Sequence, residues 1–544
     1  MKIQHKIIHT VLGISLMAGM VSCKKGFEEL NMPYKDATVS TATPAGFFNN
    51  LAKRATQEDY TIYTGLFMPI TNQQGVQNRN LPYTNYITSF WSTYYSDLAD
   101  YKQLLKLISS SPNPDVYNNV KYMANILMAQ KTLSMLDRYG DIPYSQAGIA
   151  TEGAANYKPQ YDKEEAVYSS VLDDLKAAVE GVGGANQSSI GTYESFLAND
   201  FVAWKKFGNA LRLRYAVRLS KTNLQTKAKA AIVEILGNPS TYPLPNDQDL
   251  TALYKSNYGS YPLVVVPNSP DYGDRFWYAF RELSVSNIRM SSNVFAKMSS
   301  TNADDGSGFF DPRYKVWFMP NNAGKWIPQP QNGTVADGGT PYPNTSANAP
   351  MAPGTDPDNK FASFNYYLVR DFQSFPYVII SEADVHFLKA EAYNQGIGVA
   401  ANQALAETEY NLGMRASVNF WYTTVNSNTT SIWPTAAKPG PITQAQIDVF
   451  TNNPAVKFTP GDVAGNYKKI ITQSWLASMF NAVETWCTVR RTGLTPKDAS
   501  YNPTTYNRLP YPDDEKTNNS ANLSAIGGNV GPEVQIQKKV YWMP

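Results

Sequence analysis

Histidine and cysteine are scarce in this chain, and their positions restrict the chemistry that it can perform. The histidines are His5, His9 and His386, and the cysteines are Cys23 and Cys487. The first two histidines lie in an N-terminal segment that we expect to be removed, which excludes a histidine-rich metal site. A Ser-His-Asp triad would need His386. That residue lies between apolar neighbours in a predicted helix, so we expect a core histidine with satisfied hydrogen bonds.

The N-terminus has the pattern of a signal sequence that ends at a cysteine. Two lysines among the first six residues precede a mostly apolar run, residues 7–21, which is too short to span a membrane comfortably. The run is followed closely by Cys23 and resembles a bacterial lipoprotein signal. An ordinary signal peptide with an incidental cysteine is the alternative. We therefore expect a signal peptide at 1–22, a tether at 23–42 that begins with the lipidated cysteine, and a single domain at 43–544.

The remaining cysteine and the acidic residues give no sign of catalysis. If Cys23 carries lipid, Cys487 has no partner for an intramolecular disulfide, and its apolar helical setting predicts a buried, unreactive thiol. A glycoside hydrolase needs only two carboxylates, and no acidic pair stands out among the 45 acidic residues. The stretch 302–306 (NADDG) lacks the spacing of a calcium-binding loop. We expect a turn there, and no catalytic residue, metal or cofactor.

The overall composition argues against nucleic-acid binding and suits a surface that recognises another kind of ligand. The net charge is +2 and charged residues make up 17% of the chain, which argues against a nucleic-acid partner. Aromatic residues reach 13%, with 36 tyrosines and 10 tryptophans. Such an excess suits a recognition surface, because these side chains combine apolar area with a polar group. A tyrosine-rich core is the alternative.

Most of the chain shows helical periodicity. Val120 to Leu136 is apolar on most sides, which indicates a central helix. Gly140 is placed to end it, and Pro143 prevents it from resuming. Further helices are expected after Thr43-Pro44, across Tyr94–Ile108, after the capping-box-like 162–165, and across 201–219, 228–236, 381–396, 401–420 and 467–489. Helices paired through short polar turns predict a mainly α, helical-hairpin repeat scaffold, although the literal tetratricopeptide consensus is absent.

Two long stretches and one helix face depart from this pattern. Residues 60–91 are rich in Tyr, Asn and Gln, and are expected to form an ordered surface loop. Residues 239–359 are rich in Pro, Gly, Asn and aromatic residues, and irregular segments of this length are often functional. Four basic side chains on helix 201–219 are expected to be solvated or paired with acids, namely Lys205, Arg212, Arg214 and Arg218.

Four short motifs, in order along the chain, carry a resemblance to a known family. They are 137–147 (DRYGDIPYSQA), 382–392 (EADVHFLKAEA), 484–493 (ETWCTVRRTG) and 508–519, which begins RLPYP and includes Glu515 and Asn519. The usual Ala-Glu pair of the second motif is Ala383-Asp384 here. Together with the lipoprotein signal, these motifs resemble the SusD/RagB family of surface lipoproteins. The motifs themselves are expected to be structural.

The resemblance implies a mainly α, tetratricopeptide-like SusD-like scaffold that carries long irregular loops. It implies a lipid-anchored protein on the extracellular face of the outer membrane, which forms the lid of a SusC-like TonB-dependent transporter. Members bind nutrients, most often a glycan or oligosaccharide, without catalysis. A peptide-binding member of the same family, a surface glycoside hydrolase and a purely structural surface protein are the alternatives.

Candidate ligand-binding residues follow from the resemblance and from the chemistry of sugars. Family members bind ligand with loops in the N-terminal third and the middle of the chain. Sugars need aromatic platforms beside amide, carboxylate or guanidinium groups. We therefore expect ligand contacts from Gln74, Asn78, Arg79, Tyr83, Trp91, Trp277 and Trp326. For each residue, a role in the core or in a turn is the alternative.

Overall fold

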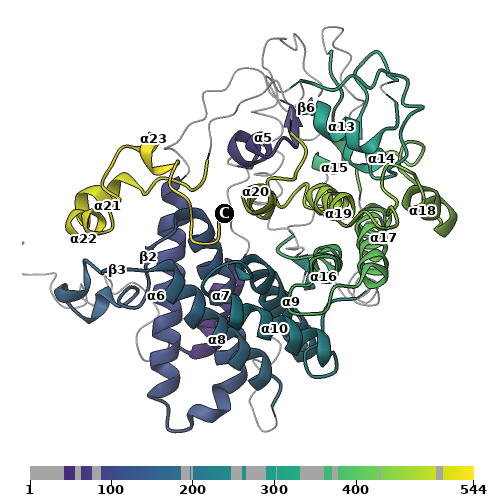
Figure 1. Ribbon diagram of the computed structural model, residues 1–544. Coiled ribbons are helices and arrows are strands. Elements are labelled where there is room, and N and C mark those ends of the chain that lie inside the picture. Colours follow the sequence, from purple (N-terminus) through teal and green to yellow (C-terminus); the bar gives the residue numbers. More distant parts are fainter. Residues whose placement is uncertain are drawn as a thin grey trace, which may run out of the picture.

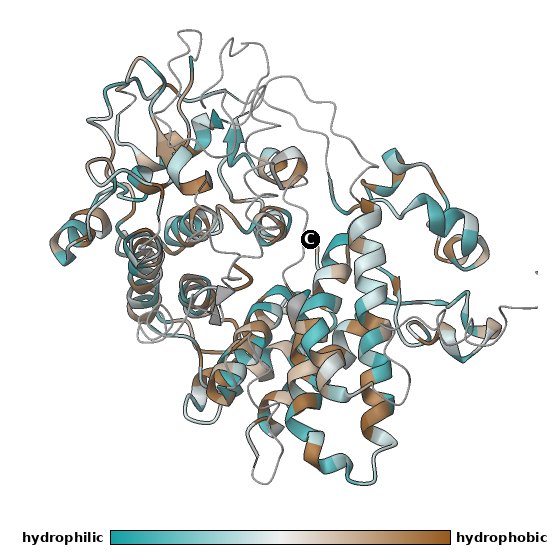
Figure 2. Cartoon of the chain, turned by 180° about the vertical axis from the view of Figure 1, so that it is seen from behind, coloured by the Kyte–Doolittle hydropathy of each residue, from teal (hydrophilic) through white to brown (hydrophobic). Residues whose placement is uncertain are grey.

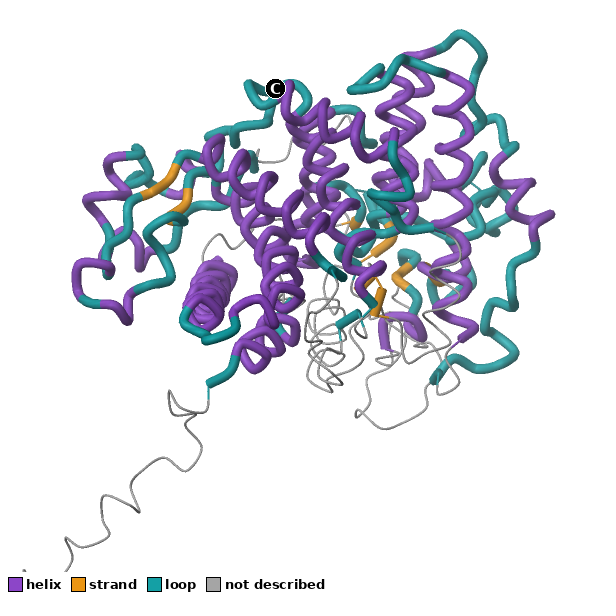
Figure 3. The backbone as a smooth tube through the Cα atoms, turned by 90° about the horizontal axis from the view of Figure 1, so that it is seen from below, coloured by secondary structure: helices purple, strands orange, loops and turns teal. Residues whose placement is uncertain are grey.

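The computed structural model is mainly helical, with strands of two residues each (Figure 3). It describes residues 42–55, 63–75, 87–184, 196–197, 200–246, 260–261, 263–264, 289–301, 303–330, 360–370, 378–427, 431–497 and 506–544. Within these ranges, no helix combines the length and the apolar character that crossing a membrane requires.

Consecutive helices pack on one another in the N-terminal half of the fold (Figure 1). These helices are α3 (Pro44–Lys53), α6 (Ile87–Ser109), α7 (Asn118–Tyr139), α8 (Glu164–Gly181), α9 (Phe201–Leu219) and α10 (Gln225–Gly237). Helix α7 lies between α6 and α8, and α9 packs on α8 and α10. This arrangement agrees with the predicted helical hairpins and confirms that residues 120–136 form a central helix.

The second half repeats this arrangement and joins the first through α9. Its helices are α16 (Glu382–Gln395), α17 (Gln403–Ser427), α18 (Gln444–Thr451), α19 (Val463–Ala477), α20 (Ala482–Thr492), α21 (Asp513–Asn518), α22 (Ser520–Ala525) and α23 (Pro532–Gln535). Helix α16 packs on α17, α19 and α9. Buried apolar side chains form one continuous cluster from Phe48 to Trp542. In Figure 2, apolar and polar residues alternate along the long helices that enclose this core.

The predicted continuous helix 467–489 is wrong, because the chain breaks between α19 and α20. Two polar side chains in the break bond to other elements instead. Ser478 Oγ bonds Asp384 Oδ1 at 3.3 Å, and Asn481 Nδ2 donates to the Ile379 carbonyl at 3.0 Å. Apolar spacing continues through the break, so periodicity alone could not place it.

The two stretches predicted as irregular contain buried regular structure. Strands β1 (Gln74–Gly75), β6 (Arg289–Met290), β8 (Ser363–Phe364) and β7 (Phe318–Met319) form an antiparallel sheet in that order. Short helices α5 (Met68–Ile70), α13 (Ser292–Met298), α14 (Tyr314–Trp317) and α15 (Tyr366–Arg370) surround it. Outside this sheet, β2 (Ile142–Pro143) pairs with β3 (Tyr161–Asp162), and β4 (Ser260–Tyr261) pairs with β5 (Leu263–Val264).

The described part of the predicted surface loop 60–91 is largely buried. Thr71 and Gln73 are fully enclosed, although both are polar. Gln73 Nε2 donates to the Trp475 carbonyl at 2.7 Å, and Trp475 Nε1 donates to the Thr71 carbonyl at 2.9 Å. These bonds satisfy the polar groups, which removes the cost of burying them. Because the partner lies about 400 positions away in the sequence, local composition gave no sign of the burial.

The predicted capping box at 162–165 is also wrong. Asp162 Oδ2 accepts hydrogen bonds from the backbone N–H groups of Tyr144 and Ser145, each at 2.9 Å. The start of α8 is capped instead by Asp141 Oδ1, which accepts from the Glu164 N–H at 2.9 Å. Both acids therefore hold the turn after α7 against the start of α8.

The end of α7 carries a buried carboxylate that several elements share. Asp137 is 2% exposed. Its Oδ1 accepts from the Tyr168 hydroxyl and from the Trp542 indole, each at 2.8 Å. Its Oδ2 accepts from the Tyr215 hydroxyl at 2.7 Å and pairs with the Arg218 guanidinium. Burial raises the pKa of both tyrosines well above 10.0, so both hydroxyls remain protonated donors.

Three of the four basic residues predicted on this face of α9, namely Arg212, Arg214 and Arg218, are buried and paired with acids, whereas Lys205 is partly exposed. Arg218 also binds both oxygens of Glu484, at 2.5 and 2.6 Å. Arg214 lies 3.3 Å from Asp384 Oδ2, and Arg212 pairs with Glu234. Burial alone would raise the pKa of Glu484, but Arg214 and Arg218 outweigh burial and hold it below 4.5. These pairs join α9 to α7, α10, α16 and α20.

The predictions for the single histidine beyond residue 9 and for Cys487 are confirmed. His386 is buried on α16, with Nδ1 2.6 Å from Glu409 Oε2 on α17 and Nε2 3.4 Å from Glu382 Oε1. Cys487 is 1% exposed, and burial raises the pKa of its thiol to about 12. A thiol with that pKa is almost entirely protonated at neutral pH and is a poor nucleophile.

Replacing Asp137 with Ala should lower the free energy of unfolding by about 3–5 kcal/mol, because it removes one partner of a buried ion pair and orphans three further donors. Urea denaturation measures the change. The control is Asp173→Ala, which removes an acid that is 67% exposed and pairs with Lys227 at 2.6 Å. That loss should cost less than about 1 kcal/mol. Equal effects of the two substitutions would contradict the central role of Asp137.

His386 should make stability depend on pH. Burial alone lowers its pKa, but the hydrogen bonds to Glu382 and Glu409 outweigh burial and raise it above 6.5. A raised folded-state pKa means that the stabilisation is fully present below pH 6.5 and is lost as pH rises through the folded pKa. We expect the melting temperature of the wild type to fall through this window relative to His386→Gln. Parallel pH profiles for the two proteins would refute the coupling.

Candidate functional site

Most of the ligand-binding residues predicted from the sequence lie outside the described residues. These are Asn78, Arg79, Tyr83 and Trp277, and the lipidation candidate Cys23 lies outside them as well. The structure places Gln74, Trp91 and Trp326. It does not bring these three together: they lie in strand β1, in helix α6 and in the segment after β7.

Gln74 and Trp91 are buried. Gln74 is 1% exposed in the four-stranded sheet, and Trp91 is 6% exposed in α6. The Trp91 indole donates to Glu515 Oε1 at 3.3 Å and meets the Tyr139 and Tyr511 rings at centroid distances of 5.0 and 5.7 Å. These contacts give Trp91 a packing role that links α6 to the C-terminal segment. Ligand contact by either residue stays a prediction. Burial leaves little of either side chain for a ligand to touch.

Trp326 belongs to a cluster of three partly exposed aromatic rings, which we call the aromatic trio: Phe309, Tyr314 and Trp326. Phe309 and Tyr314 stack with their ring centroids 4.0 Å apart and an interplanar angle of 5°. Trp326 meets Phe309 edge-on at 5.0 Å and Tyr314 edge-on at 5.3 Å. The three rings therefore hold one another in fixed orientations while each keeps part of its surface in solvent.

A tight turn places charged groups beside the trio. The backbone N–H of Trp326 donates to the backbone carbonyl of Asp304 at 2.7 Å, and Lys325 Nζ lies 3.2 Å from Asp304 Oδ1. Gly306 has a φ of +80°, and a Cβ there would come within 2.8 Å of Trp326 Nε1. Glycine is therefore required for the turn to approach the indole so closely. The described part of the predicted turn 302–306 is confirmed as a turn.

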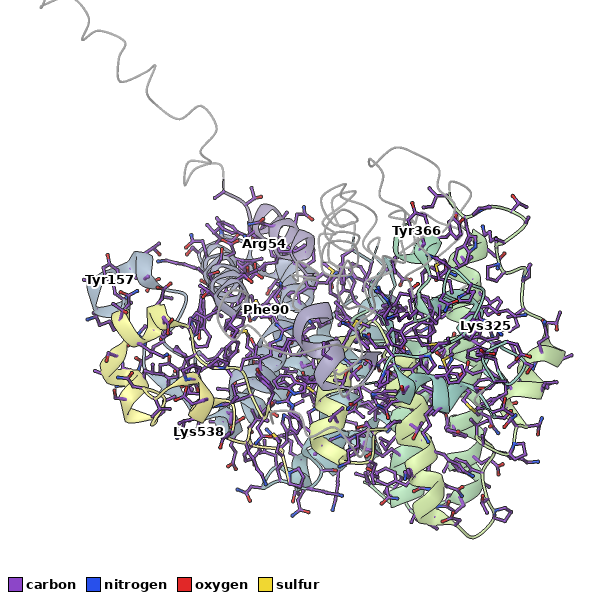
Figure 4. All side chains as sticks on the ribbon, turned by 90° about the horizontal axis from the view of Figure 1, so that it is seen from above. Arg54, Phe90, Tyr157, Lys325, Tyr366 and Lys538 are labelled. Atoms are coloured by element: carbon purple, nitrogen blue, oxygen red, sulfur yellow. The ribbon has the colours of Figure 1, made fainter. Side chains whose placement is uncertain are left out.

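The surroundings of the trio combine exposed apolar and polar groups. Asp305 lies on the surface, and hydrogen bonds from the Ser307 side chain and then from the Ser307 backbone N–H, the latter at 2.9 Å, lower the pKa of its carboxyl below 3.8. Ile327 is 37% exposed, and Lys315 Nζ lies 5.9 Å from the centre of the Tyr314 ring. Lys325 lies near one edge of the molecule in Figure 4, far from the labelled Tyr157.

Sequence reasoning found Trp326 and missed its two partners. Phe309 and Tyr314 lie in one irregular stretch with Trp326, 17 and 12 residues before it along the chain. Their joint role depends on a turn that folds residues 304–306 back over the indole. The usable signal was the density of aromatic residues between two turn-forming segments, which marks a region but does not say which rings meet.

The motifs that carry the family resemblance hold the scaffold together, as predicted. Arg490 donates to the carbonyls of Asp137 and Asn507, at 2.9 and 2.6 Å. Glu515 of the last motif accepts from the Tyr161 hydroxyl at 2.6 Å and from the Trp91 indole. None of these contacts resembles a catalytic arrangement, and within the described residues no group of three or more His, Cys, Asp and Glu side chains could hold a metal ion.

Comparisons with known proteins place these features in a family. The model of a SusD-like family, described as "Starch-binding associating with outer membrane", matches residues 31–512. No curated protein sequence is similar enough to count as a match.

Solved structures of similar fold cover almost the whole chain. A structure titled as a chitin-binding protein has a TM-score of 0.67 at 21% identity, and covers 92% of this chain and 100% of its own. A SusD/RagB family protein from Bacteroides thetaiotaomicron has a TM-score of 0.66 at 16% identity, covering 92% and 99%. A SusD homologue from Bacteroides fragilis has a TM-score of 0.63 at 20% identity, covering 92% and 100%. The fold predicted from the sequence is confirmed, and this chain belongs to the SusD-like family.

Proposed function

We propose that this chain is a non-catalytic, carbohydrate-binding lipoprotein on the extracellular face of the outer membrane. We further propose that it forms the lid of a SusC-like TonB-dependent transporter and captures an oligosaccharide before import. The description of the matching family, which joins starch binding to the outer membrane, supports the location and the ligand class. A similar structure is titled as a chitin-binding protein, which supports a glycan over a peptide.

The observation that carries the ligand class is the aromatic trio. Sugar rings present C–H groups on their faces and hydroxyl groups around their edges. Partly exposed rings of Phe309, Tyr314 and Trp326 offer an apolar surface to such faces. The Asp304 carboxylate can accept from sugar hydroxyls, and the Lys325 ammonium can donate to them. A peptide ligand would use the same rings but would leave these charges without matching hydroxyls.

The rigid arrangement of the trio suits a binding role. Each ring contacts the other two, so little conformational freedom remains to be lost when a ligand binds. Beside the trio, Asp304 is tied to Lys325 and the neighbouring Asp305 to Ser307, an arrangement that differs from the two opposed carboxylates that glycoside hydrolysis uses. We therefore assign the trio to recognition. Cleavage of a glycan by the purified protein would contradict this assignment.

Two tryptophan substitutions separate recognition from packing. Trp326→Ala should weaken glycan binding by about 2 kcal/mol, as the loss of a central aromatic contact does. It should leave the melting temperature almost unchanged, because its ring is partly exposed. Trp91→Ala should instead lower stability by about 3–5 kcal/mol, because its indole is buried. Starch and chitin oligosaccharides would be titrated calorimetrically against both variants.

The opposite results would contradict the assignment of Trp326 to ligand binding and of Trp91 to packing. Unchanged glycan affinity in Trp326→Ala would remove the trio from the ligand site. A stable Trp91→Ala protein that no longer binds would restore the sequence prediction for Trp91. Absence of any glycan binding by the wild type, combined with binding of peptides, would favour the peptide-binding alternative.

The lipid anchor is tested independently of the ligand. Cys23→Ala should leave the protein unacylated and release it from membranes, because acyl chains contribute about 0.8 kcal/mol per buried CH₂. Membrane fractionation and mass spectrometry of the N-terminus measure the two effects. Cys487→Ala is the matched control and should remain in the membrane fraction. Equal fractionation of the wild type and Cys23→Ala would overturn the lipoprotein assignment.

A further inference from the structure

A polar cavity opens at the surface of the molecule beside the C-terminus, away from the aromatic trio. It has a volume of about 290 Å³ and is lined by the ends of α9, α16 and α20, the start of α19 and the last four residues of the chain. Figure 3 shows the C-terminus at one edge of the molecule. A single buried water needs only about 10–15 Å³. The cavity is therefore large enough for a small organic molecule, and it shares no lining residue with the trio.

Two family motifs meet in one wall of the cavity. Arg491 binds Glu391 through two parallel contacts, at 2.5 and 2.7 Å. The Tyr467 hydroxyl donates to the same carboxylate at 2.9 Å. The lining also contains Trp542, whose indole nitrogen donates to Asp137 at 2.8 Å. The cavity thus has rigid polar and aromatic walls, since the groups that line it are held by other contacts.

The buried charges around the cavity are balanced, and Lys221 stands at its exposed rim, where solvent screens its charge. Arg491 is matched by Glu391, and Arg218 is matched by Asp137 and Glu484. Three helices end here, and their last carbonyl groups carry partial negative charge that disfavours anions. The remaining lining mixes hydroxyl, amide and apolar groups. A neutral molecule that can both donate and accept hydrogen bonds fits this chemistry best.

We propose that this cavity binds a monosaccharide-sized neutral polyol, at a site separate from the aromatic trio. Hydroxyl groups of such a ligand can accept from the partly exposed Arg491 guanidinium and exchange hydrogen bonds with the partly exposed Tyr467 hydroxyl. Glu391 is 2% exposed and holds both of these side chains in place. The apolar face of the sugar ring would lie toward the aromatic side chains of the walls. The size of the cavity restricts the ligand to a single ring, whereas the open trio accepts a chain.

Substitutions at the rim test the site without disturbing the walls. Gln395 lines the cavity at the end of α16 and is exposed, so Gln395→Trp can block the opening without burying strain in the core. Lys221→Trp does the same from the segment after α9. The matched control is Gln444→Trp, which places the same ring on an exposed position at the start of α18, outside the cavity.

The measurement is ligand-observed NMR of glucose and N-acetylglucosamine with the purified full chain, with a melting curve for every variant. We expect the wild type to bind at least one of these sugars, and each rim tryptophan to weaken that binding roughly tenfold or more. Gln444→Trp should bind as the wild type does. The proposal is overturned if the wild type binds neither sugar, if both rim variants bind normally, or if Trp326→Ala abolishes binding. The last outcome would assign monosaccharide binding to the trio, so the two sites can fail separately.

Discussion

The negative charge of Asp137 is buried at the end of the central helix, and the surrounding architecture has to satisfy it. An unpaired buried carboxylate costs several kcal/mol, so its partners must arrive together. They come from α8, α9 and the C-terminal segment, through Tyr168, Tyr215, Arg218 and Trp542. The same turn then uses Asp141 to cap α8. The first family motif is therefore the joint at which the N-terminal helices and the end of the chain are fixed.

The sequence predicted the helical scaffold because helices follow from local patterns. Apolar spacing located α7, and Gly140, with φ at 79°, ends it as expected. The break between α19 and α20 was missed because it depends on Asn481 reaching the Ile379 carbonyl, about 100 residues away. The buried state of Thr71 and Gln73 was missed for the same reason, since their partner is Trp475. A polar residue locally predicts exposure to solvent, but a long-range hydrogen bond can allow it to be buried.

The sequence predicted the kind of side chain in the candidate site better than it predicted which residues form the site. Trp91 and Trp326 are the same residue type in segments that both appeared irregular, yet one is packed inside and the other belongs to the partly exposed trio. A helical signal was present for Trp91, which precedes Tyr94 and Leu98 by three and seven residues. No comparable period surrounds Trp326. For these two tryptophans, helical spacing to neighbouring apolar residues therefore distinguishes the buried side chain from the partly exposed one, whereas the residue type alone does not.

The division between scaffold and recognition has a physical basis. The motif residues bind one another through buried ion pairs and backbone carbonyls, as Arg490 and Arg491 do, and such contacts tolerate little change. The aromatic trio is held by the contacts of its own rings and depends on a turn whose Gly306 fits against Trp326. Rings in the trio can therefore be replaced without disturbing the charge network around Asp137. Under the proposed function, family membership and ligand choice are therefore set by different residues, and the rings outside the motifs are the ones to test for ligand contact.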